Sequence, residues 1–253
     1  MKDIFPIKFM ITEVIFPVYN ESDTLCEQIK IFNQFFDDEF KKNIFITIAD
    51  NGSTDNTATI SDKLLKKKLI QKYVFIPQKG RGRAIKDCIK KSKADIVCYM
   101  DIDLSTDLAH LKELINSISK KGNDISIGSR LSKKSKVVGR KKIREFTSRA
   151  YNLLIKFFFP MSGIKDMQCG FKAFSRKKIL PVIDLVQNNR WFFDTELIII
   201  SRKLNLKIDQ IPVKWTDDPN TSVNIISTAI EDIVGLTKLR FKLFKKIHIR
   251  NDQ

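Results

Sequence analysis

The chain has 253 residues, of which 43% are hydrophobic, and it contains nine glycines and seven prolines. This composition is typical of a globular protein with a sizeable core, and it excludes a disordered or linker-rich chain. The net charge of +17 predicts an anionic partner, such as a nucleic acid, a phosphorylated substrate or an acidic membrane surface. A lysine-rich background composition would explain the same charge without a partner.

Membrane-spanning and secretory patterns are missing from the sequence. No apolar run approaches the roughly 18 residues of a spanning helix, and the first ten residues, interrupted by Pro6, do not follow the pattern of a signal peptide. We therefore expect a protein that is soluble or lies on a membrane without crossing it. The cysteines have neither metal-binding nor disulfide spacing, which favours a reducing cytoplasm; they are Cys26, Cys88, Cys98 and Cys169.

Strands and helices are predicted to alternate from Thr12 to Arg130. Apolar runs bounded by polar turns indicate buried strands, and apolar residues three or four positions apart indicate the helices between them. This alternation predicts an α/β fold with a doubly wound, mainly parallel sheet. The predicted strands are Thr12–Val18, Ile44–Ala49, Tyr73–Ile76, Ile96–Met100 and Asp124–Gly128, and the predicted helices cover about 25–36, 58–68, 81–91 and 108–120.

Two carboxylates, Asp101 and Asp103, directly follow the predicted strand Ile96–Met100. Ligands of open α/β sheets bind at the carboxyl ends of the strands. Two oxygen ligands at that place suit Mg²⁺ or Mn²⁺, with water and substrate phosphates completing the coordination. The pattern is short, however, and two carboxylates in a solvated turn would look the same.

Other polar groups are predicted to reach the same edge of the sheet. Tyr19 and Glu21 follow the first strand, and Asp50 follows the second. The turn Lys79–Arg83 offers backbone N–H groups and positive charge, which suit a diphosphate. Each group alone could be an ordinary turn or helix cap. Together they predict a nucleotide-diphosphate pocket with a metal at its floor.

Two ordered sets of segments carry a resemblance to known proteins. The first set is Pro17–Glu21, Asp50–Asp55, Lys79–Gly82 and Asp101–Ser105, and the second is Gly128–Arg130, Asp166–Lys172, Phe193–Glu196 and Ile211–Trp215. The first set resembles the ordered motifs of family 2 glycosyltransferases with the GT-A fold. The second set resembles the polyprenyl-phosphate branch of that family, with dolichyl-phosphate β-glucosyltransferases closer than the mannose synthases. The resemblance extends from about Thr12 to Arg240.

The resemblance implies a metal-dependent, inverting transfer of glucose or mannose from UDP-glucose or GDP-mannose to a polyprenyl or dolichyl phosphate. It implies that Asp101 and Asp103 hold Mg²⁺ or Mn²⁺ against the donor diphosphate. Asn51 stands where many relatives carry an aspartate. The implied donor-binding residues are Pro17, Tyr19, Glu21, Asp50, Gly80, Asp101, Ile102 and Asp103; the catalytic residues are Asp103 and Asp166; and the acceptor-phosphate contacts are Arg130, Arg144 and Ser148.

Several alternatives remain open at this point. A lipid phosphate is ionised near neutrality and needs no base, whereas a glycan, glycolipid or protein hydroxyl needs one, such as Asp166. Asp166 could equally be a turn residue before the strand Gly170–Phe174, and Asp194 could be the N-cap of a helix ending near Leu204. The intact aspartate pair disfavours a pseudoenzyme scaffold, and we expect no nucleic-acid partner because no recognised binding motif is present.

Two basic amphipathic helices are predicted after residue 130. Such helices suit an anionic membrane surface, or equally a core contact with a solvated basic face. Because the spans that flank the catalytic domain in many relatives are missing here, we expect peripheral attachment to the cytoplasmic face of a membrane. The apolar stripes are Ile143, Phe146, Ala150, Leu153, Leu154 and Phe157, then Ile226, Ile230, Ile233, Phe241 and Phe244. We expect one catalytic domain over 1–253, with a donor half 1–130, an acceptor half 131–222 and a basic helix within 223–253.

Overall fold

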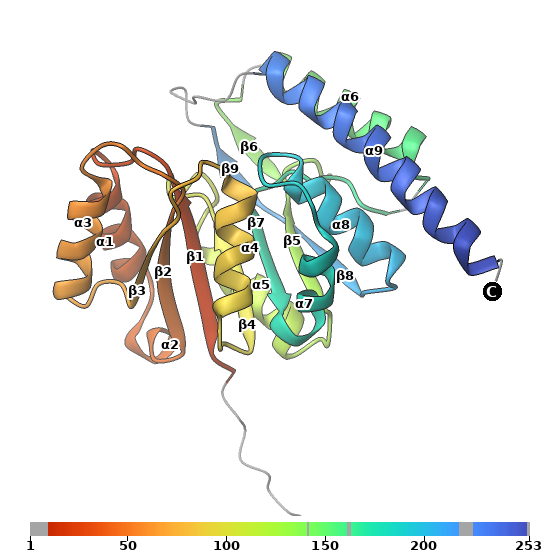
Figure 1. The fold of residues 1–253 in the computed structure, drawn as a ribbon. Helices are drawn as coiled ribbons and strands as arrows, with labels where there is room; N and C mark the ends of the chain where they lie inside the picture. The colour runs from red at the N-terminus through yellow and green to blue at the C-terminus, as the bar shows by residue number, and fades with distance from the viewer. Residues whose placement is uncertain (1–9, 141, 161–162, 218–224, 252–253) are drawn as a thin grey trace, which may run out of the picture.

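The computed structural model describes residues 10–140, 142–160, 163–217 and 225–251, and in the last helix it describes the side chains of residues 228–243. Its central feature is a seven-stranded sheet with the strand order β3-β2-β1-β4-β7-β5-β8 (Figure 1). Neighbouring strands run parallel except β7, which is antiparallel to both β4 and β5. The strands are β1 Thr12–Val18, β2 Ile44–Asp50, β3 Lys72–Phe75, β4 Ile96–Met100, β5 Ile125–Ser129, β7 Phe171–Ser175 and β8 Ile208–Pro212.

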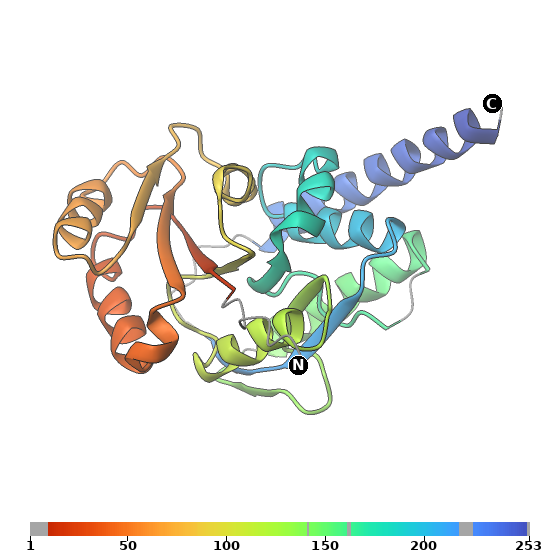
Figure 2. The ribbon, with the colours of Figure 1, turned by 90° about the horizontal axis from the view of Figure 1, so that it is seen from below.

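Helices cover both faces of the sheet, as Figures 1 and 2 show. Alternate residues of a strand point to opposite faces, so Val14 and Phe16 of β1 join one hydrophobic cluster and Ile15 joins the other. The cluster containing Val14 packs under α1 Leu25–Phe35, α3 Thr57–Lys66 and α5 Ala109–Ser119, with the short α2 Asp38–Lys41 beside it. The cluster containing Ile15 packs under α4 Arg81–Lys91, α7 Arg176–Leu185 and α8 Phe193–Lys203.

Two long helices, α6 Lys142–Phe158 and α9 Ile225–Asn251, lie side by side next to this layer (Figure 1). They contribute Ile155, Leu236 and Leu239 to the core. Within the described part of the chain, no helix is both long and apolar enough to cross a bilayer. Near the start of α6, the short strands β6 Lys136–Val138 and β9 Lys214–Thr216 pair in parallel.

The α/β architecture predicted from the sequence is confirmed: each predicted strand is present within about one residue of its expected bounds. The place of β7 was not predicted. It inserts between β4 and β5, and its register sets Lys172 opposite Tyr99. Because side chains at paired positions point to the same face, this insertion brings a lysine to the aspartate-bearing end of β4.

Candidate active site

Asp50, the last residue of β2, is fully buried. Its Oδ1 accepts a hydrogen bond from the Ser53 backbone N–H (2.8 Å), and its Oδ2 accepts one from the Tyr73 hydroxyl (2.9 Å). Burial and the neighbouring carboxylate raise the pKa of Tyr73, so the phenol stays a donor. Asp50 therefore shapes the turn that follows β2, at the edge where the sequence predicted a nucleoside.

Asn51 connects three elements of the same edge. Its Nδ2 donates to the Val18 carbonyl at the end of β1 (2.6 Å), and its Oδ1 accepts from the Gly80 N–H at the start of α4 (3.1 Å). An aspartate could accept from Gly80 but could not donate to Val18. The Asn51 amide therefore links the ends of β1 and β2 to the start of α4, and an ionised aspartate could make only one of these two contacts.

The glycine turn before α4 meets the residues that follow β1. Lys79 Nζ lies 3.5 Å from the ring centroid of Tyr19, within cation–π range. At Gly80, a Cβ atom would lie 2.5 Å from the Asn189 carbonyl oxygen, so no other residue fits this approach. Glu21 accepts a hydrogen bond from the Thr24 hydroxyl at 2.9 Å.

Two of the residues predicted to bind the donor have side chains in the interior. Pro17 is buried within β1, opposite Ala49 of β2, and Ile102 belongs to the core cluster under α1 and α5. Only their backbone groups are therefore placed to meet a ligand.

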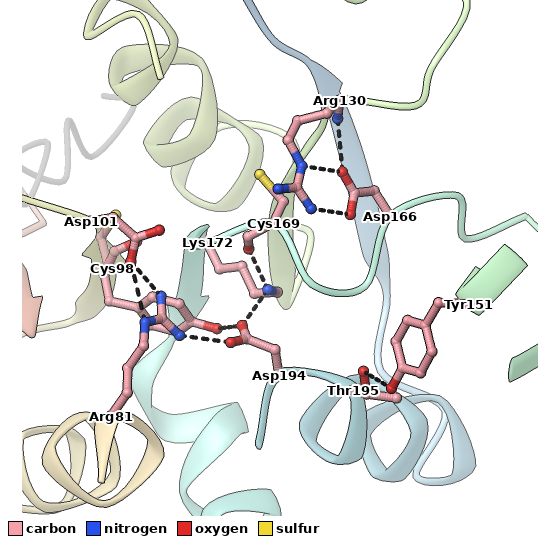
Figure 3. Close-up of polar contacts among 11 residues, drawn as sticks. Arg81, Cys98, Asp101, Arg130, Tyr151, Asp166, Cys169, Lys172, Asp194 and Thr195 are labelled. Atoms are coloured by element: carbon pink, nitrogen blue, oxygen red, sulfur yellow. Dashed lines mark hydrogen bonds and ion pairs between the residues drawn. The ribbon is translucent and has the colours of Figure 1, made fainter. Parts of the chain in front are cut away.

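Asp101, at the end of β4, is held by Arg81 of α4 (Figure 3). The guanidinium donates from Nη2 (2.7 Å) and Nε (3.2 Å) to the same oxygen, Oδ1. The other oxygen, Oδ2, faces the backbone of Gly170, where a Cβ atom would lie only 2.0 Å away. Asp101 is thus fixed by a rigid fork on one oxygen, and its side chain remains about one-third exposed.

Behind Asp101 lies a buried charge network centred on Asp194 of α8 (Figure 3). Asp194 accepts from Arg81 Nη1 (2.7 Å), from the Lys172 ammonium and from the Tyr99 hydroxyl. Burial alone would raise the pKa of Asp194, but Lys172 and Arg81 outweigh it and the pKa is lowered. Two cations thus balance two carboxylates, the buried Asp194 and the partly exposed Asp101.

The aspartate pair fits a divalent cation. Asp103 is exposed, and its Oδ1 accepts the Ser105 N–H at 2.9 Å. Among the described residues no group of three or more histidine, cysteine or acidic side chains could hold a metal. Mg²⁺ typically binds through one or two carboxylates together with substrate phosphates. Asp101 and Asp103 are carboxylates of this kind and would hold the ion, with a bound donor diphosphate completing its coordination.

Arg130 and Asp166, predicted as an acceptor contact and a candidate base, are partners (Figure 3). Arg130 donates to Asp166 Oδ2 from its backbone N–H (3.0 Å) and Nε (2.8 Å), and to Oδ1 from Nη2 (2.9 Å). Burial of Asp166 opposes ionisation, but the Arg130 charge prevails and lowers its pKa. A carboxylate held in this way is a weak base.

Arg144 and Ser148 lie on α6, in its first turns. Arg144 Nη1 donates to Asp217 Oδ2 at 2.6 Å. Ser148 Oγ accepts from Arg140 Nη2, also at 2.6 Å. Two of the predicted acceptor residues, Arg144 and Ser148, therefore lie at the start of α6 beside Arg140, which sequence reasoning had not assigned, whereas Arg130 lies just after β5.

The model of the family described as glycosyl transferase family 2 matches residues 13–180. The chain belongs to this family. It is a glycosyltransferase, as the ordered motifs predicted.

Curated relatives are similar over most of the chain. Glycosyltransferase AglD of Haloferax volcanii is 30% identical over 94% of the chain, which spans only 37% of that longer protein. Dolichyl-phosphate β-glucosyltransferases of Dictyostelium discoideum and Saccharomyces cerevisiae are 28% and 26% identical, each over 94% of the chain and 76% of the relative.

Among solved structures, glucosyl-3-phosphoglycerate synthase from Mycobacterium tuberculosis superposes with a TM-score of 0.66 at 17% identity, over 91% of this chain and 80% of that one. That crystal contains Mn²⁺, UDP and glucosyl-3-phosphoglycerate. The likeness confirms the GT-A fold of this family 2 glycosyltransferase.

Two residues of the charge network, Tyr99 and Lys172, had no role of their own in the sequence analysis. Arg81 was expected, as part of the turn Lys79–Arg83, to offer positive charge to a diphosphate, but its buried guanidinium is bound to Asp101 and Asp194. Asp194 was quoted within the motif Phe193–Glu196 and considered as a possible N-cap. The N-cap interpretation is wrong, because the N-cap of α8 is Phe192 and Asp194 lies inside the first turn of the helix. One signal was available, because Lys172 interrupts an otherwise apolar predicted strand. Lysine is almost never fully buried without a partner, so an acidic counterpart was to be expected.

Proposed function

We propose that this glycosyltransferase transfers glucose, with inversion, from UDP-glucose to a polyprenyl phosphate, with Mg²⁺ or Mn²⁺ bound at Asp101 and Asp103. The relatives named dolichyl-phosphate β-glucosyltransferase support the lipid phosphate and the sugar. The Mn²⁺ and UDP in the structurally similar synthase support the metal and the nucleotide. Mannose from GDP-mannose is the alternative donor.

The observation that carries the choice of acceptor is the Arg130–Asp166 pair. A hydroxyl acceptor would need a base, and Asp166, the carboxylate predicted for that role, is locked on both oxygens by Arg130 with a lowered pKa. A phosphate monoester already carries its negative charge. Its oxygen can attack the anomeric carbon while the bond to the UDP oxygen breaks on the opposite face, with no proton to remove.

In this mechanism the chain positions two anionic substrates. When bound, the metal would act as a Lewis acid for the departing diphosphate. Arg81 keeps Asp101 in one orientation, and Lys79 and the positive N-terminal end of α4 would face the charge that develops on the diphosphate. The arginines near α6 attract the acceptor phosphate.

We further propose that the paired helices α6 and α9 attach the protein to an anionic membrane. Phe146 and Phe157 of α6 are 69% and 83% exposed, although they belong to the apolar stripe predicted from the sequence. Exposed apolar groups flanked by cations match a bilayer surface with anionic lipids. The exposed apolar residues are Ile143, Phe146, Leu153 and Phe157 of α6 and Ile230, Ile233, Val234 and Phe241 of α9, and exposed cations beside them are Lys142, Lys156, Lys238 and Arg240. The side chains of Ile226 and Phe244 lie outside the described residues.

The test combines purified protein and Mg²⁺ or Mn²⁺ with UDP-glucose or GDP-mannose. The acceptors are citronellyl phosphate, a ten-carbon isoprenyl monophosphate, and citronellol as its hydroxyl counterpart. We expect product only from the combination of UDP-glucose and citronellyl phosphate, which should give glucosyl citronellyl phosphate and release UDP. Transfer to citronellol, abolished by Asp166→Asn, would instead establish the hydroxyl reaction.

A further inference from the structure

The segment before α6 contains a guanidinium with an unmet hydrogen-bond donor. Arg140 Nη2 donates to Ser148 Oγ (2.6 Å) and to the Arg144 carbonyl (3.3 Å). Its Nη1 is buried and has no partner among the described residues. Buried polar atoms are rarely unpaired, and the other two in the described parts of the chain, on Ser126 and Asp232, are oxygens.

Two other arginines of this region, unlike Arg140, form ion pairs with carboxylates. Arg130 is paired with Asp166, and Arg144 with Asp217. Arg140 forms no ion pair within the described residues. Burial, and then the Arg130 charge, lower the pKa of Arg140, whereas the nearby carboxylates Asp166 and Asp217 only partly offset this. The surroundings of Arg140 therefore favour one additional anion.

The position of Arg140 indicates the shape of that anion. It precedes α6, whose N-terminal turn carries partial positive charge. The Ser148 hydroxyl, oriented by Arg140 Nη2, can donate its own proton to an incoming oxygen. Phe146, between them in sequence and on the exposed apolar face of α6, offers a surface for a hydrocarbon chain. A phosphate joined to an apolar tail matches all three features.

We propose that Arg140, with Ser148, binds the phosphate of the lipid acceptor, while Arg130 and Arg144 mainly keep their own carboxylate partners. This inference rests on the proposed function and makes it more specific. Arg140 Nη1 would donate to a phosphate oxygen, and the isoprenyl chain would leave along the exposed face of α6 toward the membrane.

The test compares Arg140→Gln, Arg140→Lys and the control Lys93→Gln, which removes one exposed charge just before β4, at the opposite end of that strand from Asp101. Steady-state rates give the Michaelis constants for citronellyl phosphate and for UDP-glucose. We expect Arg140→Gln to raise the constant for citronellyl phosphate at least tenfold and to leave that for UDP-glucose within twofold. Arg140→Lys should recover part of the loss, and Lys93→Gln should match the parent.

Thermal unfolding supplies a readout that does not depend on turnover. Citronellyl phosphate should raise the melting temperature of the parent protein and of Lys93→Gln, but not of Arg140→Gln. The inference would be overturned if Arg140→Gln had the Michaelis constant of the parent for citronellyl phosphate and the same ligand-induced shift in melting temperature. A buried water would then be the partner of Arg140 Nη1. A parent protein that transfers glucose to citronellol and never to citronellyl phosphate would overturn the proposed function itself, and the role of Arg140 with it.

Discussion

Arg81 holds Asp101 and Asp194 at the same time: Nη2 lies 2.7 Å from Asp101 Oδ1, and Nη1 lies 2.7 Å from Asp194 Oδ2. One guanidinium thereby joins the strand that ends in the aspartate pair to helix α8 on one face of the sheet. Because the guanidinium is planar and its donors have a fixed spacing, it limits how either carboxylate can turn. The orientation of the Asp101 carboxylate therefore depends on helix α8, which follows it by more than 90 positions in the sequence.

This relationship predicts a loss of stability when the arginine is removed. Arg81→Gln leaves a buried carboxylate short of a partner, which costs about 3–5 kcal/mol. Asp194→Asn should also destabilise the protein, and the double variant should lose less than the sum of the two, since the residues share one network. Urea unfolding measures all three free energies. As a control, Arg149→Gln, which removes an exposed i,i+4 pair with Glu145, should change the free energy of unfolding by less than about 0.5 kcal/mol. Strictly additive losses in the Arg81→Gln, Asp194→Asn double variant would contradict the coupling.

Metal dependence is predicted from the aspartate pair. Asp103→Ala should reduce transfer by several orders of magnitude with only a small decrease in melting temperature, because the Asp103 side chain is exposed and gives up one hydrogen bond, from the Ser105 N–H. Chelation with EDTA should stop the parent enzyme, and added Mn²⁺ should restore it. Asp38→Ala removes a carboxylate that is 93% exposed on α2, and this variant should remain fully active. A normal transfer rate in EDTA would rule out the metal site.

The free energy of unfolding should decrease as the pH rises, because of Asp232 in α9. This carboxyl is buried, with Oδ2 accepting from Gln168 Nε2 (2.8 Å), and burial raises its pKa to about 7 from an ordinary value of 3.8. The folded chain therefore holds a proton that the unfolded chain has released. The stabilisation is complete below the ordinary pKa and is lost as pH rises toward 7, at up to about 1.4 kcal/mol per pH unit.

Urea unfolding between pH 5 and pH 8 measures this effect. The free energy of unfolding of the parent should fall across that range, and the decline should be smaller in Asp232→Asn, which cannot ionise. Parallel pH profiles for the two proteins would show that Asp232 does not titrate there.

Membrane attachment is predicted to depend on the exposed apolar face of α6. Phe146→Ser and Phe157→Ser should each weaken co-sedimentation with vesicles that contain phosphatidylserine, while Phe75→Ser, at an exposed position in the edge strand β3, should not. Binding of the parent should fall at high salt, because attraction between surface charges is screened within about 8 Å at physiological ionic strength. Equal binding to neutral and anionic vesicles would contradict the role of the basic residues.

The sequence by itself determined the layers of the fold and much of the donor edge. Strand and helix periodicity is a local property, so β1, β2 and β4 could be located from neighbouring residues alone. Parallel strands then bring their carboxyl ends to one edge, which predicted that Tyr19, Asp50 and Asp101 would gather there. The family followed from the order of the same motifs.

Only the tertiary structure decided how the charges pair. Arg81 and Asp194 are 113 positions apart, and β7 reaches β4 by an antiparallel insertion that no local pattern specifies. The exposure of the α6 stripe was equally undecided, because an amphipathic pattern is the same whether its apolar side meets a core or a membrane. In the folded chain, Ile155 faces the core, and Phe157, two positions later, is left outside it.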